Sequence, residues 1–298
     1  MSLQHFIFRK LLKRMLYKPM SIAELREQQA KSAKMMAKLP KSIAVDTVEI
    51  ERIHAEWITH ENADAEKVIL YLHGGGYVAG TLDGYHQLCG TLSQATGMRV
   101  LMPEYRLAPD YPFPAALEDS LSVYAWLGQN GFSAENIIIA GDSAGGGLTL
   151  ATTLAIRDEG RALPAGLVCL SPWTDLTFSG ESHKTNAAKE IVLHPENLAL
   201  WAEKYLGFAD PRTPHISPAF ADMKNFPPML IQVGSDEVFL DDAKMVAERA
   251  QSAGVDVTLT IYEGMWHVWQ TVGVLAETKR AFEEIGAFVE GLKLKVEG

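Results

Sequence analysis

Short apolar runs alternate with longer amphipathic stretches along most of the chain. A run of about four to eight apolar residues between turn residues is typical of a buried strand, whereas helical spacing of apolar positions predicts a helix. The predicted strands are 44–59, 67–72, 99–103, 136–140, 165–170, 229–233 and 256–262, and the predicted helices are 85–96, 117–130, 146–155, 241–253 and 278–292. This alternation predicts an α/β fold with a mostly parallel sheet that helices cover on both faces.

Two segments do not follow this alternation. Residues 1–43 are rich in Lys, Arg and Met and have a helical pattern, and residues 178–218 contain a helical pattern over 195–206. We expect both segments to form a helical cap over one edge of the sheet, with residues 44–298 as the main domain and 178–218 as an insertion in it.

The N-terminal stretch 5–18 is basic and amphipathic and has no acidic residue. Packing of its apolar face on the protein, as a cap helix, is the interpretation we favour. Contact with an anionic lipid surface is the alternative, because basic amphipathic helices also lie at membrane interfaces. Charged residues interrupt every apolar run here, so a signal peptide is not predicted.

Composition narrows the class of protein. A chain of 298 residues and 32.8 kDa suits one α/β domain with additions, and its net charge of −10 argues against a nucleic-acid partner. The two cysteines, Cys89 and Cys169, lie in apolar surroundings and predict no disulfide. Without an export signal or a long apolar span, we expect a cytoplasmic protein. Dimers through an outer strand or helix are common in this type of fold, so a homodimer is a further expectation.

The candidate chemistry centres on Gly141-Asp142-Ser143-Ala144-Gly145, which lies between a predicted strand and a predicted helix. A serine at such a sharp turn sits in strained backbone, and the flanking glycines let the chain turn there without a clash. The pattern predicts a nucleophile elbow with Ser143 at its tip.

A nucleophilic serine needs a base and donors for the developing oxyanion. His73-Gly74-Gly75-Gly76 follows the strand 67–72, and its glycines expose backbone N–H groups without the sequence pattern of a phosphate loop. Of the nine histidines, His267 follows the last predicted strand and precedes the terminal helix, which fits the chain order nucleophile, acid, base. We expect His73 to brace the glycine loop instead.

The third group should be a carboxylate after the strand 229–233, where Asp236 and Glu237 are adjacent. Neighbouring side chains of an extended chain point opposite ways, so only one of the two can face His267. Its role would be to orient the imidazole and to stabilise the imidazolium. Residue chemistry alone leaves both carboxylates open.

With these motifs, the chain resembles the hormone-sensitive-lipase-like branch of the α/β-hydrolases, from about His73 to His267. The matching motifs are His73–Tyr77, Tyr105–Asp110, Pro114–Asp119, Gly141–Gly146 and Ser171–Asp175. The resemblance implies an eight-stranded type of sheet with a helical cap, and an active site without metal or organic cofactor.

The resemblance also assigns site residues. Ser143 would be the nucleophile and His267 the base, and the N–H groups of Gly75, Gly76 and Ala144 would form the oxyanion hole. The family's acid usually lies four residues before a second Asp and about thirty before the histidine, and both spacings indicate Glu237. Asp236 stays the alternative, because Asp is the family's usual residue.

The function that follows is hydrolysis of short- to medium-chain carboxylic esters through an acyl-enzyme. An amidase or arylformamidase on the same machinery is the alternative. A small-molecule receptor of the same fold is a third hypothesis. The presence of Ser143, His267 and a carboxylate argues against it.

Overall fold

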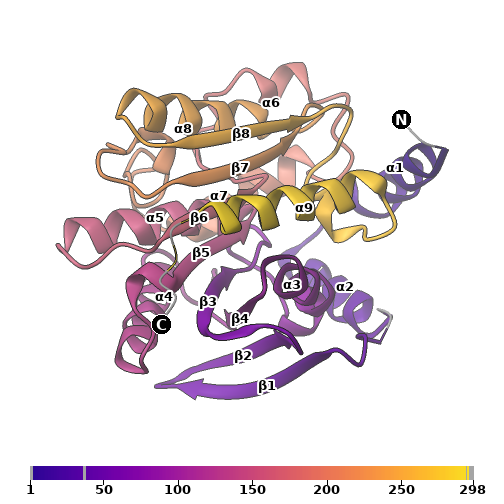
Figure 1. The fold of residues 1–298 in the computed structure, drawn as a ribbon. Coiled ribbons are helices and arrows are strands. Elements are labelled where there is room, and N and C mark those ends of the chain that lie inside the picture. Colours follow the sequence, from indigo (N-terminus) through magenta and orange to yellow (C-terminus); the bar gives the residue numbers. More distant parts are fainter. Residues whose placement is uncertain (1–2, 36–37, 293, 295–298) are drawn as a thin grey trace.

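The computed structural model describes residues 3–35, 38–292 and 294. One sheet of eight strands, in the order β1-β2-β4-β3-β5-β6-β7-β8, forms the centre of the molecule (Figure 1). Its strands are β1 (Ile43–Ile50), β2 (Ile53–His60), β3 (Asp64–Leu72), β4 (Met98–Pro103), β5 (Ile137–Asp142), β6 (Gly166–Leu170), β7 (Met229–Gly234) and β8 (Val257–Tyr262). From β4 to β8 the neighbouring strands are parallel, and β2 is antiparallel to both its neighbours. The predicted α/β fold with a mostly parallel sheet is confirmed.

The prediction of a single strand over 44–59 was wrong, because the chain reverses in the middle of that stretch. Glu51 and Arg52 form a two-residue turn, and β1 and β2 pair across it with Ile50 opposite Ile53. Glu51 has a φ of 55°, a left-handed conformation that glycine or asparagine usually supplies in such hairpins. The turn has no such residue, so the sequence pattern does not reveal it.

Helices cover both faces of the sheet. They are α1 (Leu3–Leu16), α2 (Ile22–Met35), α3 (Leu82–Thr96), α4 (Ala115–Gln129), α5 (Ala144–Asp158), α6 (Ser182–Thr185), α7 (Pro195–Leu206), α8 (Leu240–Ser252) and α9 (Ala276–Gly291), with short 3₁₀ turns η1 (Ala134–Asn136), η2 (Pro218–Phe220) and η3 (Trp269–Thr271). Helices α3 and α9 pack on one face, and α4, α5 and α8 pack on the other. Alternate residues of β5 serve the two cores: Ile137 and Ile139 face one, and Ile138 faces the other.

The register of the parallel strands brings their carboxyl ends to one edge. Leu72 of β3 pairs with Gly141 of β5, and Gly234 of β7 pairs with Tyr262 of β8. Loops that follow these strands therefore start side by side, which is where ligands bind in open α/β sheets.

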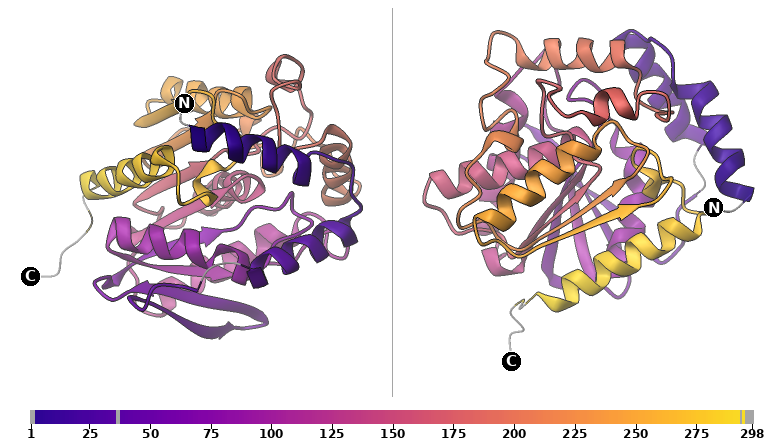
Figure 2. Two further views of the ribbon diagram at one scale, coloured as in Figure 1. Left: turned by 90° about the vertical axis from the view of Figure 1, so that its right-hand side faces the viewer. Right: turned by 90° about the horizontal axis from the view of Figure 1, so that it is seen from above.

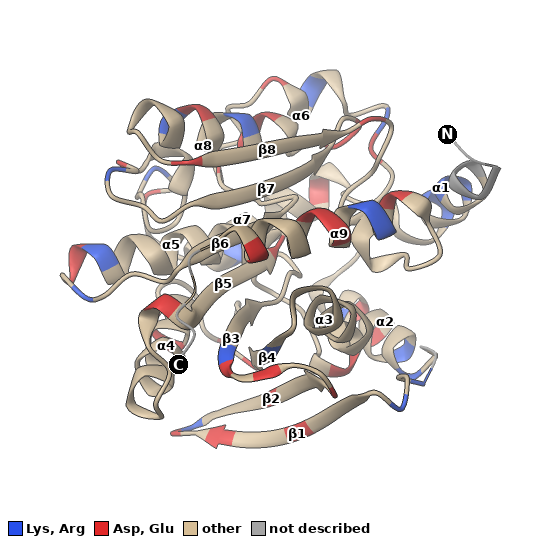
Figure 3. Cartoon of the chain, in the orientation of Figure 1, with Lys and Arg blue, Asp and Glu red and all other residues tan. Residues whose placement is uncertain are grey.

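The helices of the predicted cap segments lie together beside this edge. Figure 2 shows α1 and α2 next to the segment that contains α6 and α7. The main-chain N–H of Met20 donates to Asn197 Oδ1 (2.9 Å), and the Tyr17 hydroxyl donates to the carbonyl of Ala187 (3.3 Å). Several residues of α1 are Lys or Arg (Figure 3). None of the helices in the described ranges has the length and apolar character needed to cross a membrane.

Candidate active site

Ser143 occupies the turn between β5 and α5 with φ 53° and ψ −123°. Positive φ is costly for a residue with a side chain, so surrounding structure must hold it there. Glycine at position 145 is required by close packing: a Cβ atom would lie 1.9 Å from the carbonyl oxygen of Leu72. The strained turn predicted from the sequence is present, with Ser143 6% exposed.

Three predicted residues meet at the carboxyl edge of the sheet. His267 Nε2 lies 2.9 Å from Ser143 Oγ, and His267 Nδ1 lies 2.8 Å from Glu237 Oε2. Ser143 follows β5, Glu237 follows β7 and His267 follows β8. This is the hydrogen-bond arrangement of a nucleophile, a base and an orienting acid.

The adjacent carboxylate, Asp236, has a different partner. Its Oδ2 pairs with Arg9 Nη1 of α1 at 2.8 Å, while Glu237 is fully buried and contacts His267. The two neighbouring side chains thus point to different surroundings, and Glu237 is the carboxylate within reach of the imidazole.

The second oxygen of Glu237 has two donors that the sequence reasoning missed. Ser171 Oγ donates to Glu237 Oε1 at 2.7 Å, and the Gly234 N–H donates to the same oxygen at 2.6 Å. Ser171 Oγ also accepts from the N–H of Val268, next to the histidine (3.2 Å). Ser171 comes directly after β6, so its place at the end of a parallel strand was the available signal.

The surroundings of His267 favour its protonated form. Burial lowers the pKa of the imidazole, but the hydrogen bond and charge of Glu237, with the charges of Glu190 and Asp142, outweigh burial and raise the pKa above 6.5. A base whose pKa lies near the working pH transfers protons efficiently.

The predicted oxyanion-hole residues lie beside Ser143. Gly75 and Gly76 line the same cavity as Ser143, and Ala144 is the first residue of α5, where helical N–H groups are free of intrahelical partners. Asp142 fixes the start of the glycine loop, since its Oδ1 accepts from the N–H of Gly74 at 3.0 Å. The hydroxyls of Tyr71 (2.9 Å) and Tyr85 (3.0 Å) donate to the same carboxylate.

His73 braces this loop. Its Nδ1 lies 2.8 Å from the carbonyl oxygen of Gly74, and its ring stacks on Tyr105 with the centroids 4.2 Å apart. Burial outweighs the hydrogen bond to Gly74 and lowers the pKa of His73 to about 4. The imidazole is therefore neutral near pH 7 and structural in its contacts.

An apolar cavity of about 330 Å³ opens onto Ser143 and His267. Residues from both predicted cap segments line it, together with the loop after His267. Its large apolar side chains are Leu12, Leu16, Met20, Leu25, Val192, Leu193, Trp201, Trp266, Val268 and Val272. The cavity suits an uncharged, mostly apolar ligand.

Among the described residues, one group of His, Asp or Glu side chains could converge on a metal ion: Glu56, Asp83 and His86. None of the three lines the cavity. The carboxylate of Glu56 already lies 2.7 Å from His86 Nε2.

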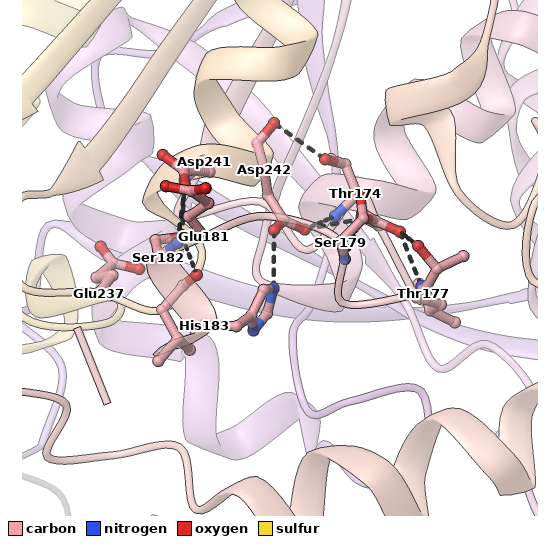
Figure 4. Close-up of polar contacts among 12 residues, drawn as sticks. Thr174, Thr177, Ser179, Glu181, Ser182, His183, Glu237, Asp241 and Asp242 are labelled. Atoms are coloured by element: carbon pink, nitrogen blue, oxygen red, sulfur yellow. Dashed lines mark hydrogen bonds and ion pairs between the residues drawn. The ribbon is translucent and has the colours of Figure 1, made fainter. Parts of the chain in front are cut away.

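Behind the site, the first turn of α8 is tied to the segment that follows β6 (Figure 4). Buried Asp242 accepts from the N–H groups of Thr174 and Asp175, both at 2.9 Å, and lies 3.2 Å from His183 Nε2. Asp241 Oδ2 accepts from the N–H of Ser182 at 2.7 Å. These contacts fix the residues that follow Glu237.

Comparisons with known proteins identify the family of the chain. A family model described as the alpha/beta hydrolase fold matches residues 69–271. An acetyl-hydrolase from Streptomyces hygroscopicus is 44% identical over 254 residues, which cover 83% of this chain and 85% of that protein. An esterase from Acinetobacter venetianus is 36% identical over 254 residues, which cover 83% and 84% of the two chains.

Solved structures match nearly the full length. An esterase from the bacterial hormone-sensitive lipase family has a TM-score of 0.93 and 38% identity, covering 98% of this chain and 99% of that one. The structure of EstE5 soaked with p-nitrophenyl butyrate has a TM-score of 0.92 and 38% identity, covering 97% and 98%. The chain therefore belongs to the α/β-hydrolase fold family and, within it, to the hormone-sensitive-lipase-like esterases.

Proposed function

We propose that this carboxylic ester hydrolase cleaves short- to medium-chain acyl esters with Ser143 as nucleophile, His267 as general base and Glu237 as orienting acid. The observation that carries the proposal is the pair of hydrogen-bond distances at His267, 2.9 Å to Ser143 Oγ and 2.8 Å to Glu237 Oε2, beside an apolar cavity.

The proposed reaction begins when Ser143 Oγ attacks the ester carbonyl carbon while His267 Nε2 takes the hydroxyl proton. The N–H groups of Gly75, Gly76 and Ala144 would stabilise the oxyanion of the tetrahedral intermediate. The alcohol leaves with the proton from His267, which gives an acyl-enzyme. His267 takes a proton from a water molecule, which attacks the acyl carbon. The bond between that carbon and Ser143 Oγ then breaks, Oγ regains its proton from His267, and the acid is released.

The size and lining of the cavity support the substrate class. A volume of about 330 Å³ lined mostly by apolar side chains suits an acyl chain of limited length. The name of one relative, an ethyl acetate hydrolase from Pseudomonas putida that is 33% identical over 237 residues, fits a small ester.

Hydrolysis of p-nitrophenyl esters from acetate to laurate, by wild type and by Ser143→Ala, tests the proposal. We expect turnover to peak at short to medium chains and to disappear in the variant. Turnover that persists in Ser143→Ala would place the chemistry elsewhere. An ester and an amide with the same acyl group distinguish esterase from amidase, and labelling of Ser143 by a fluorophosphonate distinguishes an enzyme from a receptor.

Contact of residues 5–18 with lipid is a separate hypothesis, and the outward face of α1 supports it. Ile7, Leu11 and Met15 follow helical spacing and are 55%, 50% and 46% exposed. Sedimentation with anionic and with neutral vesicles tests it. Salt-sensitive binding to the anionic vesicles alone would support lipid contact, and absence of binding to both kinds of vesicle would reject it in favour of the cap helix.

A further inference from the structure

The active-site acid lies in a loop whose main-chain groups are held by side chains from one segment of the insertion. We call residues 235–241 the acid loop and residues 182–190 the brace. Ser182 Oγ donates to the carbonyl of Val238 at 2.6 Å, and it accepts from the N–H of Asp241 at 3.1 Å. Asn186 Nδ2 donates to the carbonyls of Ser235 (3.0 Å) and Glu237 (2.8 Å).

The brace ends at Glu190, a carboxylate that the proposed chemistry does not use. Glu190 is 1% exposed. Its Oε1 accepts from the N–H groups of Ile191 (2.8 Å), Val192 (2.8 Å) and Leu193 (3.2 Å), and its Oε2 accepts from the N–H of Val238 (3.3 Å). An ionised carboxylate only accepts hydrogen bonds, so it matches this set of four donors.

Glu190 therefore joins two parts of the site. Val192 and Leu193 line the cavity, and Val238 is the residue directly after Glu237. A buried charge is costly to keep without compensation, and here main-chain N–H groups surround it. A glutamine of the same shape would turn an NH₂ group toward one of these donors.

We propose that Glu190 is a positioning residue of the active site: it holds the acid loop at Val238 and places a second buried carboxylate charge near His267. This inference rests on the proposed triad. It adds a residue that touches neither substrate nor the reacting atoms and acts through Glu237 and His267.

The charge of Glu190 acts together with other groups around the imidazole. Burial lowers the pKa of His267. Glu237 opposes this effect most strongly, and the charges of Glu190 and Asp142 raise the pKa further. Burial raises the pKa of Glu190 above its ordinary value, and the charge of Glu237 adds to the rise, while the charge of His267 and the N–H donors of Val192 and Leu193 oppose it in part. Burial raises the pKa of the Tyr17 hydroxyl, directly after α1, and the charge of Glu190 raises it further.

The test compares Glu190→Gln with wild type in kcat and KM for p-nitrophenyl butyrate across a range of pH. We expect kcat to fall by about ten- to a hundredfold with KM little changed, because a displaced acid loop misplaces the reacting groups. We also expect the acidic limb of kcat/KM to move to lower pH. The control is Glu196→Gln, which removes the same charge from an exposed position on α7 and should leave both quantities unchanged.

A folded Glu190→Gln variant with wild-type kcat, or with its acidic limb unmoved, would overturn the proposal. If this variant does not unfold cooperatively, Glu190→Asp replaces it. The aspartate keeps the charge on a shorter side chain, so kcat should fall while the limb stays in place, and a wild-type kcat would again overturn the proposal. Activity of the wild type, absent in Ser143→Ala, is measured beside these variants, so failure of the triad itself is recognised separately.

Discussion

At the scale of single residues, Asp236 and Glu237 are adjacent carboxylates with different partners. Glu237 accepts from Ser171 and Gly234 on one oxygen and faces His267 with the other. Asp236 pairs with Arg9, and its side chain is 16% exposed. Of these two negative charges, that of Glu237 faces the imidazole, and that of Asp236 attaches α1.

Exchange of each carboxylate for its amide should separate these roles. We expect Glu237→Gln to lower kcat by about 10³- to 10⁴-fold, because an amide no longer holds the imidazole in the tautomer that accepts the serine proton. Asp236→Asn should keep most activity and lose about 1 kcal/mol of stability with the Arg9 ion pair. Steady-state kinetics and chemical denaturation measure both, and equal losses of kcat would contradict the assignment.

The pH dependence of activity should follow His267. The imidazole must be neutral to accept the serine proton, and its pKa is raised above 6.5. Activity should therefore rise with pH along an acidic limb whose midpoint lies above pH 6.5. The measurement is kcat/KM against pH, corrected for spontaneous ester hydrolysis. A midpoint at or below 6.5 would show that the charges around His267 do not outweigh its burial.

Ser143 and His267 could be predicted from the sequence, because each follows a predicted strand in a fixed chain order. The position of the acid could be narrowed to Asp236 and Glu237, because spacing is visible along the chain. The partners of the acid could not be read in this way. Ser171 and Glu237 are 66 residues apart, and Glu190 and Val238 are 48 apart, so only the folded chain brings them together.

At the scale of elements, α1 has an inner and an outer face. Phe8 and Leu12 pack against the cluster that contains Trp266 and Trp269, and Leu12 and Leu16 line the cavity. The inner face agrees with the cap helix favoured from the sequence.

A larger side chain on the inner face of α1 should shorten the acyl pocket. In Leu16→Trp we expect the ratio of kcat/KM for p-nitrophenyl octanoate to that for the acetate to fall about tenfold, since the added ring fills space that a longer chain needs. Leu11→Trp is the matched control, because Leu11 is 50% exposed on the outer face of the same helix. A similar change in both variants would argue against α1 as a wall of the pocket.

The inner parallel strands were predictable to within a few residues, because burial on both sides gives them continuous apolar runs. The β1–β2 hairpin was not, since its turn at Glu51 lacks the residues that usually mark one. Helix α7 begins at Pro195 and ends at Leu206, as its pattern predicts, with proline at the first helical position.

At the scale of the whole molecule, His267, the proposed general base, also affects the stability of the fold. The folded-state pKa of His267 is raised, so the proton on His267 stabilises the folded chain below about pH 6.5. This contribution is lost as pH rises through the folded-state pKa. The proposed catalysis needs a neutral imidazole, and the folded chain with neutral His267 lacks this stabilising contribution.

Denaturation at two pH values should reveal this link. The free energy of unfolding of wild type, minus that of His267→Asn, should be larger near pH 6 than near pH 9. The comparison with the variant removes the contributions of His54 and His86, whose pKa values their carboxylate partners Glu49 and Glu56 also raise. A difference that stays constant with pH would mean that His267 binds its proton equally in both states.

The separate origins of the cavity wall and the reacting groups also bear on how this enzyme can be redesigned. At the elbow, Gly145 cannot take a larger side chain, because a Cβ atom would clash with the main chain of Leu72. Leu12, Leu16 and Met20, in contrast, come from a segment outside the sheet. A combinatorial library at these three positions would explore new substrate ranges while the strand-end loops keep their arrangement. Among the members of such a library, variants with an altered acyl preference should therefore be far more frequent than variants without turnover.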